Sequence, residues 1–252
     1  MGYFLPDPRW EQPALLNARK APNGRYTIDY SNSLAKDLAA VYIPGQYYNP
    51  VTDTPYEIYS TSTFPAFSNG ASEADGTSVL WSDLPGPPGS MEWTIYARVS
   101  ASQTGAGTLF GTGTDQSAAE RGFYIYFSID RIRYFVAGVG GESQVINTNF
   151  VVTDGEFYDI CFTTRSAADH EGWLKDVDTS INNYTSATDI TVRAIENVTN
   201  KVNVFANTTS GIAYKISPSP CEIECGFIWF RGFQDKDYKQ MVTNPYQFLI
   251  PV

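Results

Sequence analysis

Charged residues are scarce in this sequence, and positively charged ones are the scarcest. Only 17% of its 252 residues are charged, and 17 Lys and Arg against 27 Asp and Glu leave a formal net charge of -10. Proteins that bind nucleic acid by neutralising its phosphates need clustered Lys and Arg. The composition therefore predicts no nucleic-acid partner of that kind.

Long apolar runs are also missing. No stretch reaches the roughly 18 consecutive apolar residues of a membrane-spanning helix. Residues 1–10 contain Pro6 and Pro8 and lack the apolar core of a signal peptide. We expect neither a membrane-spanning segment nor export by the usual secretory route.

Cysteine and histidine are rare, which restricts the disulfides, metal sites and nucleophilic centres that the chain could form. The three cysteines, Cys161, Cys221 and Cys225, cannot form the even framework of a disulfide-stapled domain, so we expect free thiols. The spacing of Cys221 and Cys225 gives at most half a zinc site. His170, the only histidine, lies in a polar stretch and is predicted to be exposed. No metal site, cofactor or nucleophilic centre is predicted from these residues.

What is abundant favours β structure. Aromatic residues make up 15% and hydrophobic residues 42% of the chain, a balance that suits pleated, half-buried strands. Residues 92–100 alternate, with Trp93, Ile95, Ala97 and Val99 on one face. A single break at Asp130 predicts a hairpin. Further strands are expected at 38–43, 56–59, 66–67, 108–112, 122–129, 131–137, 143–147, 156–164, 173–177, 191–192, 202–205 and 224–231, and a short helix at 235–241. The pattern predicts an all-β sandwich or barrel, with an apolar tail that packs back on it.

The N-terminal segment reads differently from the rest. Four prolines before residue 24 exclude a helix or a central strand. We predict a Pro-rich extended arm over residues 1–28 and a single domain over residues 29–252. Aromatic and aliphatic residues in the arm need burial, either on its own domain or on a neighbouring subunit. The predicted assembly contacts are Tyr3, Phe4, Trp10, Leu15 and Leu16.

Several short motifs resemble a known family. Gly-Thr-Leu-Phe-Gly at 107–111, Arg-Gly-Phe-Tyr-Ile-Tyr at 121–126 followed by Arg-Ile-Arg-Tyr at 131–134, and Asp-Gly-Glu-Phe-Tyr-Asp-Ile at 154–160 occur in the order found in laminin-G-like domains of the concanavalin type. The closing stretch 228–245 is similar too, and the lead-in at 29–34 resembles versions encoded in phages and prophages. The family's usual Tyr-Val-Asp-Gly hairpin is altered here to Trp-Leu-Lys-Asp-Val at 173–177.

The resemblance implies an antiparallel β-sandwich of jelly-roll type that binds carbohydrate or adheres to surfaces. Such domains sometimes hold a calcium ion between loops, and Asp115 and Asp130 lie in loops of suitable type, although loop Asp residues usually serve turns. A sugar site would use an exposed aromatic platform, while most aromatics in a sandwich are core. The candidates are Tyr47, Tyr48, Tyr56 and Trp81.

An enzymatic alternative rests on two acids. Glu222 and Glu224 alternate along one predicted strand, and laminarinase-type glycosidases use such a pair. The sequence lacks the Asp and the third acid of that pattern, and two alternating Glu residues are ordinarily a solvated strand face. We expect no enzymatic activity.

These observations together predict a phage virion structural protein, either a capsid decoration or a tail or fibre component. Its arm would bind other virion proteins, its jelly roll would face outward to cell-surface glycans, and copies could form a homo-oligomer. Its location would be the virion. The alternatives are a free carbohydrate-binding lectin module and a laminarinase-like glycosidase.

Overall fold

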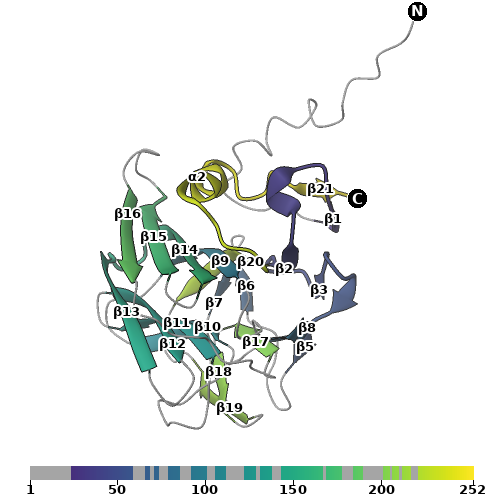
Figure 1. The fold of residues 1–252 in the computed structure, drawn as a ribbon. Helices are drawn as coiled ribbons and strands as arrows, with labels where there is room; N and C mark the ends of the chain where they lie inside the picture. Colours follow the sequence, from purple (N-terminus) through teal and green to yellow (C-terminus); the bar gives the residue numbers. More distant parts are fainter. Residues whose placement is uncertain are drawn as a thin grey trace, which may run out of the picture.

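The computed structural model describes most of the domain and none of residues 1–23 (Figure 1). The described residues are 24–58, 66–68, 71–73, 79–85, 92–100, 106–111, 122–128, 131–137, 143–166, 169–177, 184–189, 201–204, 206–209, 212–216 and 221–252. They are mostly β, which confirms the all-β prediction. No described helix is long and apolar enough to cross a membrane.

Two large sheets carry the fold. The seven-stranded sheet has the order β13 (Ser143–Val151), β12 (Arg131–Ala137), β11 (Gly122–Ser128), β10 (Ala106–Gly111), β17 (Lys201–Val204), β8 (Val79–Pro85) and β5 (Glu57–Ile58). The eight-stranded sheet has the order β16 (Tyr184–Asp189), β15 (Asp169–Asp176), β14 (Phe157–Ser166), β9 (Trp93–Ser100), β20 (Glu222–Trp229), β7 (Ala71–Glu73) and β6 (Ala66–Ser68), with β2 (Leu38–Tyr42) also paired to β20.

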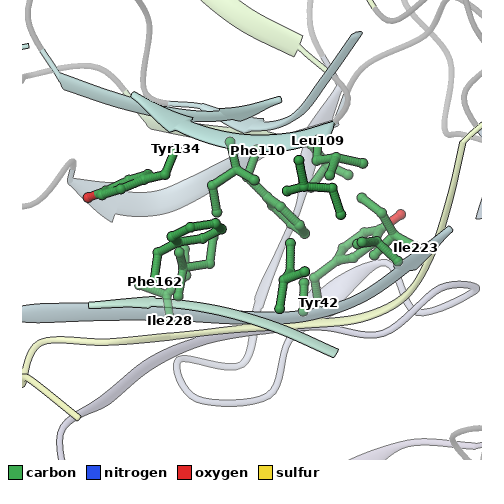
Figure 2. Close-up of a cluster of buried hydrophobic side chains, with 14 of the residues drawn as sticks. Tyr42, Leu109, Phe110, Tyr134, Phe162, Ile223 and Ile228 are labelled. Carbon is green, nitrogen blue, oxygen red and sulfur yellow. The ribbon is translucent and has the colours of Figure 1, made fainter. Parts of the chain in front are cut away.

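The core lies between these two sheets. Figure 2 shows Leu109, Phe110 and Tyr134 of the seven-stranded sheet pointing toward Phe162 and Ile228 of the eight-stranded sheet. All five side chains are buried, and the apolar positions predicted for residues 93–99 belong to the same cluster. Interdigitation of two inner faces is how stacked sheets exclude water from a common core.

A third layer covers the outer face of the eight-stranded sheet. It consists of the 3-10 turn η2 (Ser33–Ala35), the helix α2 (Asp235–Thr243) and a two-stranded ribbon of β1 (Tyr26–Ile28) and β21 (Leu249–Pro251), all on the same side of the sheet in Figure 1. A second hydrophobic cluster fills the interface and contains Tyr96, Trp173, Phe227, Trp229 and Tyr238. The alternate positions of β9 are therefore buried as well, and all eight of its residues are covered.

Local sequence explains how α2 begins and where it sits. Gln234 and Asp237 form a capping box, in which the Asp237 carboxylate accepts from the Gln234 backbone N–H at 2.9 Å. Two threonines on the outer face of the sheet, Thr94 and Thr163, each accept a hydrogen bond from the backbone N–H of Phe233, at 3.0 and 2.9 Å. These bonds fix the chain just before the helix, and the predicted helix over 235–241 is confirmed.

The two ends of the described domain meet at the ribbon. Thr27 pairs with Ile250, and the backbone N–H of Val252 donates to the carbonyl of Arg25 at 3.0 Å. The prediction that the C-terminal tail packs back is confirmed, because Tyr246, Phe248 and Leu249 are buried in the second cluster. Residues 26–28, placed at the end of the predicted arm, are strand residues of this ribbon, while the boundary between arm and domain stays a prediction.

Some strands escaped the sequence patterns. β8, β16 and the hairpin of β18 (Ala206–Thr209) and β19 (Ile212–Ile216) lie in polar or Pro-containing stretches where the sequence pattern predicts no strand. The hairpin pairing of β11 with β12 across residue 130 is confirmed. The expected strand at 191–192 lies outside the described residues.

His170 is buried, in contrast to its predicted exposure. It lies on β15 two residues from Gly172 and four from Leu174, whose side chain packs in the inter-sheet core. The period of two along a strand places His170 on that same face. Its Nδ1 lies 2.9 Å from Oγ1 of Thr164, and only 3% of the residue is exposed. All three cysteines are free and buried, as the sequence predicts for free thiols.

Candidate functional site

The outer face of the eight-stranded sheet carries a buried ion pair at its centre. Arg98 on β9 and Asp159 on β14 are direct cross-strand partners. Nε and Nη2 of Arg98 donate to the two carboxylate oxygens of Asp159, at 2.9 and 3.2 Å. Both side chains are at most 5% exposed. Because the guanidinium donates to both carboxylate oxygens, the interaction within the pair offsets much of the free-energy cost of burying the two charges.

Glu224 belongs to this network and not to a solvated strand face. A register shift between Ile223 and Cys225 makes Glu224 the extra residue of a bulge in β20. Its carboxylate is buried and lies 4.0 Å from Nη1 of Arg98. Glu222, by contrast, is half-buried beside Ser100 of β9. The expectation of two alternating solvated acids is therefore wrong for Glu224.

Side chains of the third layer close over the ion pair. The hydroxyl of Tyr96 donates to Asp159, and the hydroxyl of Tyr238 on α2 donates to the Asp159 backbone carbonyl at 3.0 Å. Burial, and then the charge of Asp159, raise the pKa of Tyr96 well above its usual value. Burial likewise raises the pKa of the Cys225 thiol to about 12. All of these side chains are buried, so the ion pair lies inside the domain and not on its surface.

The four aromatic residues predicted for a sugar site lie in different environments. Tyr56 is core, because its ring packs 6.0 Å from Tyr42 and its hydroxyl donates to the carbonyl of Val41. Tyr47 is 56% exposed at the start of the hairpin formed by β3 (Tyr48–Asn49) and β4 (Thr54–Pro55). Trp81 lies on β8, and its side chain is outside the described residues.

Tyr48 has a structural task at the ribbon. Its hydroxyl accepts from the backbone N–H of Tyr26 at 2.7 Å and lies 3.3 Å from the carbonyl of the same residue, so it occupies the outer edge of β1. The guanidinium of Arg25 covers the Tyr48 ring at 4.7 Å and pairs with Asp53 at 3.0 Å. On the other edge, Pro251 has no N–H to donate. Both edges of the ribbon are thus protected from the addition of a foreign strand.

The outer face of the seven-stranded sheet carries a different set of side chains. On β11 and β12, Ile125, Phe127, Ile132 and Tyr134 point into the core. The residues between them point the other way because side chains alternate across a strand. On these two strands, the residues of this face whose side chains the structure describes are Tyr126, Arg131 and Arg133, all half-buried. We call these three residues the Tyr–Arg face.

Arg133 stands out within the Tyr–Arg face. It is the direct cross-strand partner of Tyr126. Its Nε is fully buried and donates to no acceptor among the described residues, and no ion pair with Arg133 is found there. The pairing of β12 with β13 is also irregular at this position, since three residues of β13, 147–149, stand opposite Arg133 alone. Bulges of this kind re-aim strands and are frequent beside functional sites.

Sequence reasoning recognised the strand at residues 131–137 but not this site. The signal was present in the alternation of Ile132 and Tyr134 with Arg131 and Arg133, which places two cations on one face. The sequence does not show that Arg133 forms no ion pair with any acid of the described residues.

Other predicted sites cannot be placed. Asp115 and Asp130, the calcium candidates, lie outside the described residues, as do the arm contacts Tyr3, Phe4, Trp10, Leu15 and Leu16. Within the described part of the chain, no group of three or more His, Cys, Asp or Glu side chains could hold a metal ion.

Comparison with known proteins gives a fold and no family. No protein-family model and no curated protein matches the sequence. The binding domain of botulinum neurotoxin serotype G matches over 82% of this chain with a TM-score of 0.57 and 12% identity. The binding domain of botulinum neurotoxin DC in complex with SialylT matches over 83% with a TM-score of 0.59 and 8% identity. The binding domain of Paraclostridial Mosquitocidal Protein 1 matches over 85% with a TM-score of 0.61 and 9% identity.

The chain spans about half the length of these three structures, 51%, 52% and 54% of them respectively. At such low identity the likeness establishes a shared β fold and nothing about chemistry. The resemblance to laminin-G domains, and to their phage-encoded branch, stays a prediction.

Proposed function

We propose that this chain is a non-enzymatic binding module, a lectin-like jelly roll carried on the surface of a phage virion as a capsid decoration or a tail or fibre component. The observation that carries the proposal is the layering of the domain. The ribbon where the chain enters at Arg25 packs on the eight-stranded sheet, and the Tyr–Arg face lies beyond the other sheet (Figure 1). A domain attached at its ribbon would present the Tyr–Arg face outward.

The solved structures of similar fold support a binding role. One of them is a botulinum neurotoxin DC binding domain in complex with SialylT, and another is the same type of domain in complex with rat synaptotagmin II, with a TM-score of 0.61 and 10% identity. Domains of this fold thus use their surfaces to bind sugars or proteins. We extend a binding role to the present chain.

The fate of the two candidate acids supports a role without catalysis. A retaining glycosidase needs two carboxyl groups about 5 Å apart that both face the substrate. Glu224 instead lies buried beside Arg98 beneath the third layer. A carboxylate held in an internal ion-pair network is poorly placed to attack a sugar.

The arm is proposed as the anchor to other virion proteins. It joins the domain at Gly24, beside a ribbon whose edges are protected by Tyr48 and Pro251. Strand addition at the ribbon is therefore disfavoured, and we assign attachment to the side chains of the arm. The virion location itself rests on the phage-like lead-in at residues 29–34.

Cosedimentation tests the proposal. Full-length protein and a variant that begins at Gly24 are each mixed with particles of the source phage that lack the protein, and circular dichroism verifies that both are folded. We expect the full-length protein to pellet with the particles and the truncated one to stay in solution. Failure of the folded full-length protein to bind would remove the virion role.

A free lectin module is the second candidate, and the Tyr–Arg face favours it. The same two proteins are applied to a glycan array. If both bind glycans while neither binds particles, the lectin function replaces the virion function.

A further inference from the structure

We infer that the Tyr–Arg face binds an acidic saccharide, with the guanidinium of Arg133 taking the sugar carboxylate and the ring of Tyr126 supporting the sugar. This inference deepens the proposed function, because it names the class of ligand and the residues that select it. It rests on the proposed binding role but not on the virion location.

The state of Arg133 points to a ligand. A buried polar atom without a hydrogen-bond partner loses its hydration and gains nothing in return, a cost that is larger for charged groups. Nε of Arg133 is such an atom within the described structure. A ligand that offered an acceptor to this half-buried guanidinium would lower that cost, which points to a partner from outside the described part of the domain.

Arg98 shows what the partner of Arg133 should be. On the other sheet, at a position that also faces away from the inter-sheet core, Nε and Nη2 of Arg98 both donate to the carboxylate of Asp159. The same fork on Arg133 has no acid across the strand, where its partner is Tyr126. Planar, two-point recognition of a carboxylate is the arrangement that a guanidinium favours.

Charge also selects an acidic ligand. The chain carries a net charge of -10, so an anion is repelled by most of its surface. Arg133 is a local exception, because no acid of the described residues forms an ion pair with it. A cation without an internal counter-charge attracts an anion locally, and this attraction weakens as salt is added.

Tyr126 is the residue that would contact the sugar ring of the ligand. Directly opposed residues of an antiparallel pair have Cβ atoms about 5 Å apart, so the side chains of Tyr126 and Arg133 leave the sheet from neighbouring positions on one face. An aromatic ring with a polar tip offers an apolar face to the C–H groups of a sugar and a hydroxyl to its oxygens. A free carboxylate would use the arginine alone, whereas a uronic or sialic acid would use both residues.

The test measures binding of glucuronic acid and sialyllactose against their neutral counterparts, glucose and lactose, by NMR titration of the full-length protein. We expect the acidic sugars to bind and the neutral ones to bind at least about tenfold more weakly, as loss of a charge-assisted pair implies. Arg133→Gln should remove the preference for acid. Arg133→Lys keeps the positive charge but loses the planar guanidinium, and it should retain less than half of the wild-type preference for acidic sugars.

The control is Arg25→Gln, which makes the same change of charge at the ribbon, where Arg25 is 68% exposed and paired with Asp53. Binding should be unchanged in this variant. Tyr126→Leu should weaken the acidic sugars and leave acetate unaffected.

The outcomes separate this inference from the proposed function. Equal affinity for acidic and neutral sugars, or unchanged binding in folded Arg133→Gln, overturns the inference while glycan binding stands. Binding of inorganic sulfate or phosphate in place of carboxylated sugars overturns the ligand class. If no glycan binds to the wild-type protein at all, both the inference and the lectin role fail.

Discussion

Arg98 and Asp159 face one another across β9 and β14 and share two hydrogen bonds in the middle of the eight-stranded sheet, under the helix α2. The pair explains why the outward side of β9 can be as fully buried as its inward side. It also sets Arg133 apart, because the guanidinium on the opposite sheet forms no ion pair with an acid among the described residues. Arg98 has its partner within its own sheet, whereas we infer that the partner of Arg133 comes from outside.

Breaking the Arg98–Asp159 pair should destabilise the domain strongly. Asp159→Ala leaves a buried guanidinium without its acid, and we expect the free energy of unfolding in urea to fall by about 3–5 kcal/mol. The double variant Arg98→Met with Asp159→Leu removes both charges and should lose less than Asp159→Ala alone. If the double variant is the less stable of the two, the pair contributes more than its desolvation costs.

Gly226 should tolerate no side chain. A Cβ at this position would lie 2.9 and 3.0 Å from two ring carbons of Phe110 on the facing sheet. Gly226→Ala is expected to cost about 1–3 kcal/mol through overpacking, as measured by thermal or urea unfolding. The same substitution in a Phe110→Leu background should cost measurably less. Equal costs in both backgrounds would show that the two sheets do not meet at this contact.

Stability should decline in alkali, partly through Cys225. Its thiol has a pKa raised by burial from 9.0 to about 12 in the folded protein. Below pH 9 the thiol is protonated in both states and its contribution is complete. Between pH 9 and 12 only the unfolded chain releases the proton, so the free energy of unfolding falls as the pH rises.

The measurement compares urea unfolding of the wild type and of Cys225→Ala at about pH 8 and about pH 10. The variant should lose less stability across this interval than the wild type does. Tyr26, whose pKa burial and the nearby Tyr48 raise to about 12, keeps some dependence on pH in both proteins. Identical pH dependence in the two proteins would contradict the role of Cys225.

Two truncations should behave differently although they differ by five residues. A chain that begins at Gly24 keeps β1, whereas one that begins at Asp29 loses the buried side chains of Tyr26 and Ile28. Burial of each apolar side chain contributes about 1.5–3 kcal/mol, so the shorter chain should be less stable by at least about 3 kcal/mol. Hydrogen exchange at Ile250 should also accelerate. Equal stability of the two chains would place Tyr26–Ile28 with the arm.

The sequence by itself determined the strands with clear alternation and their inward faces. Alternation at 93–99 and at 131–134 requires period-two structure, the capping pattern at 234–237 starts a helix, and an odd set of cysteines leaves free thiols. Each of these features is local, because it depends on residues a few positions apart. For that reason the β class, α2 and the core positions were accessible without coordinates.

Only the tertiary structure decided what covers each face. Alternation along the strands predicts that Glu224 and Arg98 point away from the core, but it does not predict that a third layer buries them. It does not reveal that His170 and Tyr56 are buried. It puts Arg133 on an outer face without revealing that no described acid pairs with it. Burial and pairing depend on elements more than a hundred residues apart, as in the contact of Phe110 with Gly226, and periodicity along one strand carries no record of them.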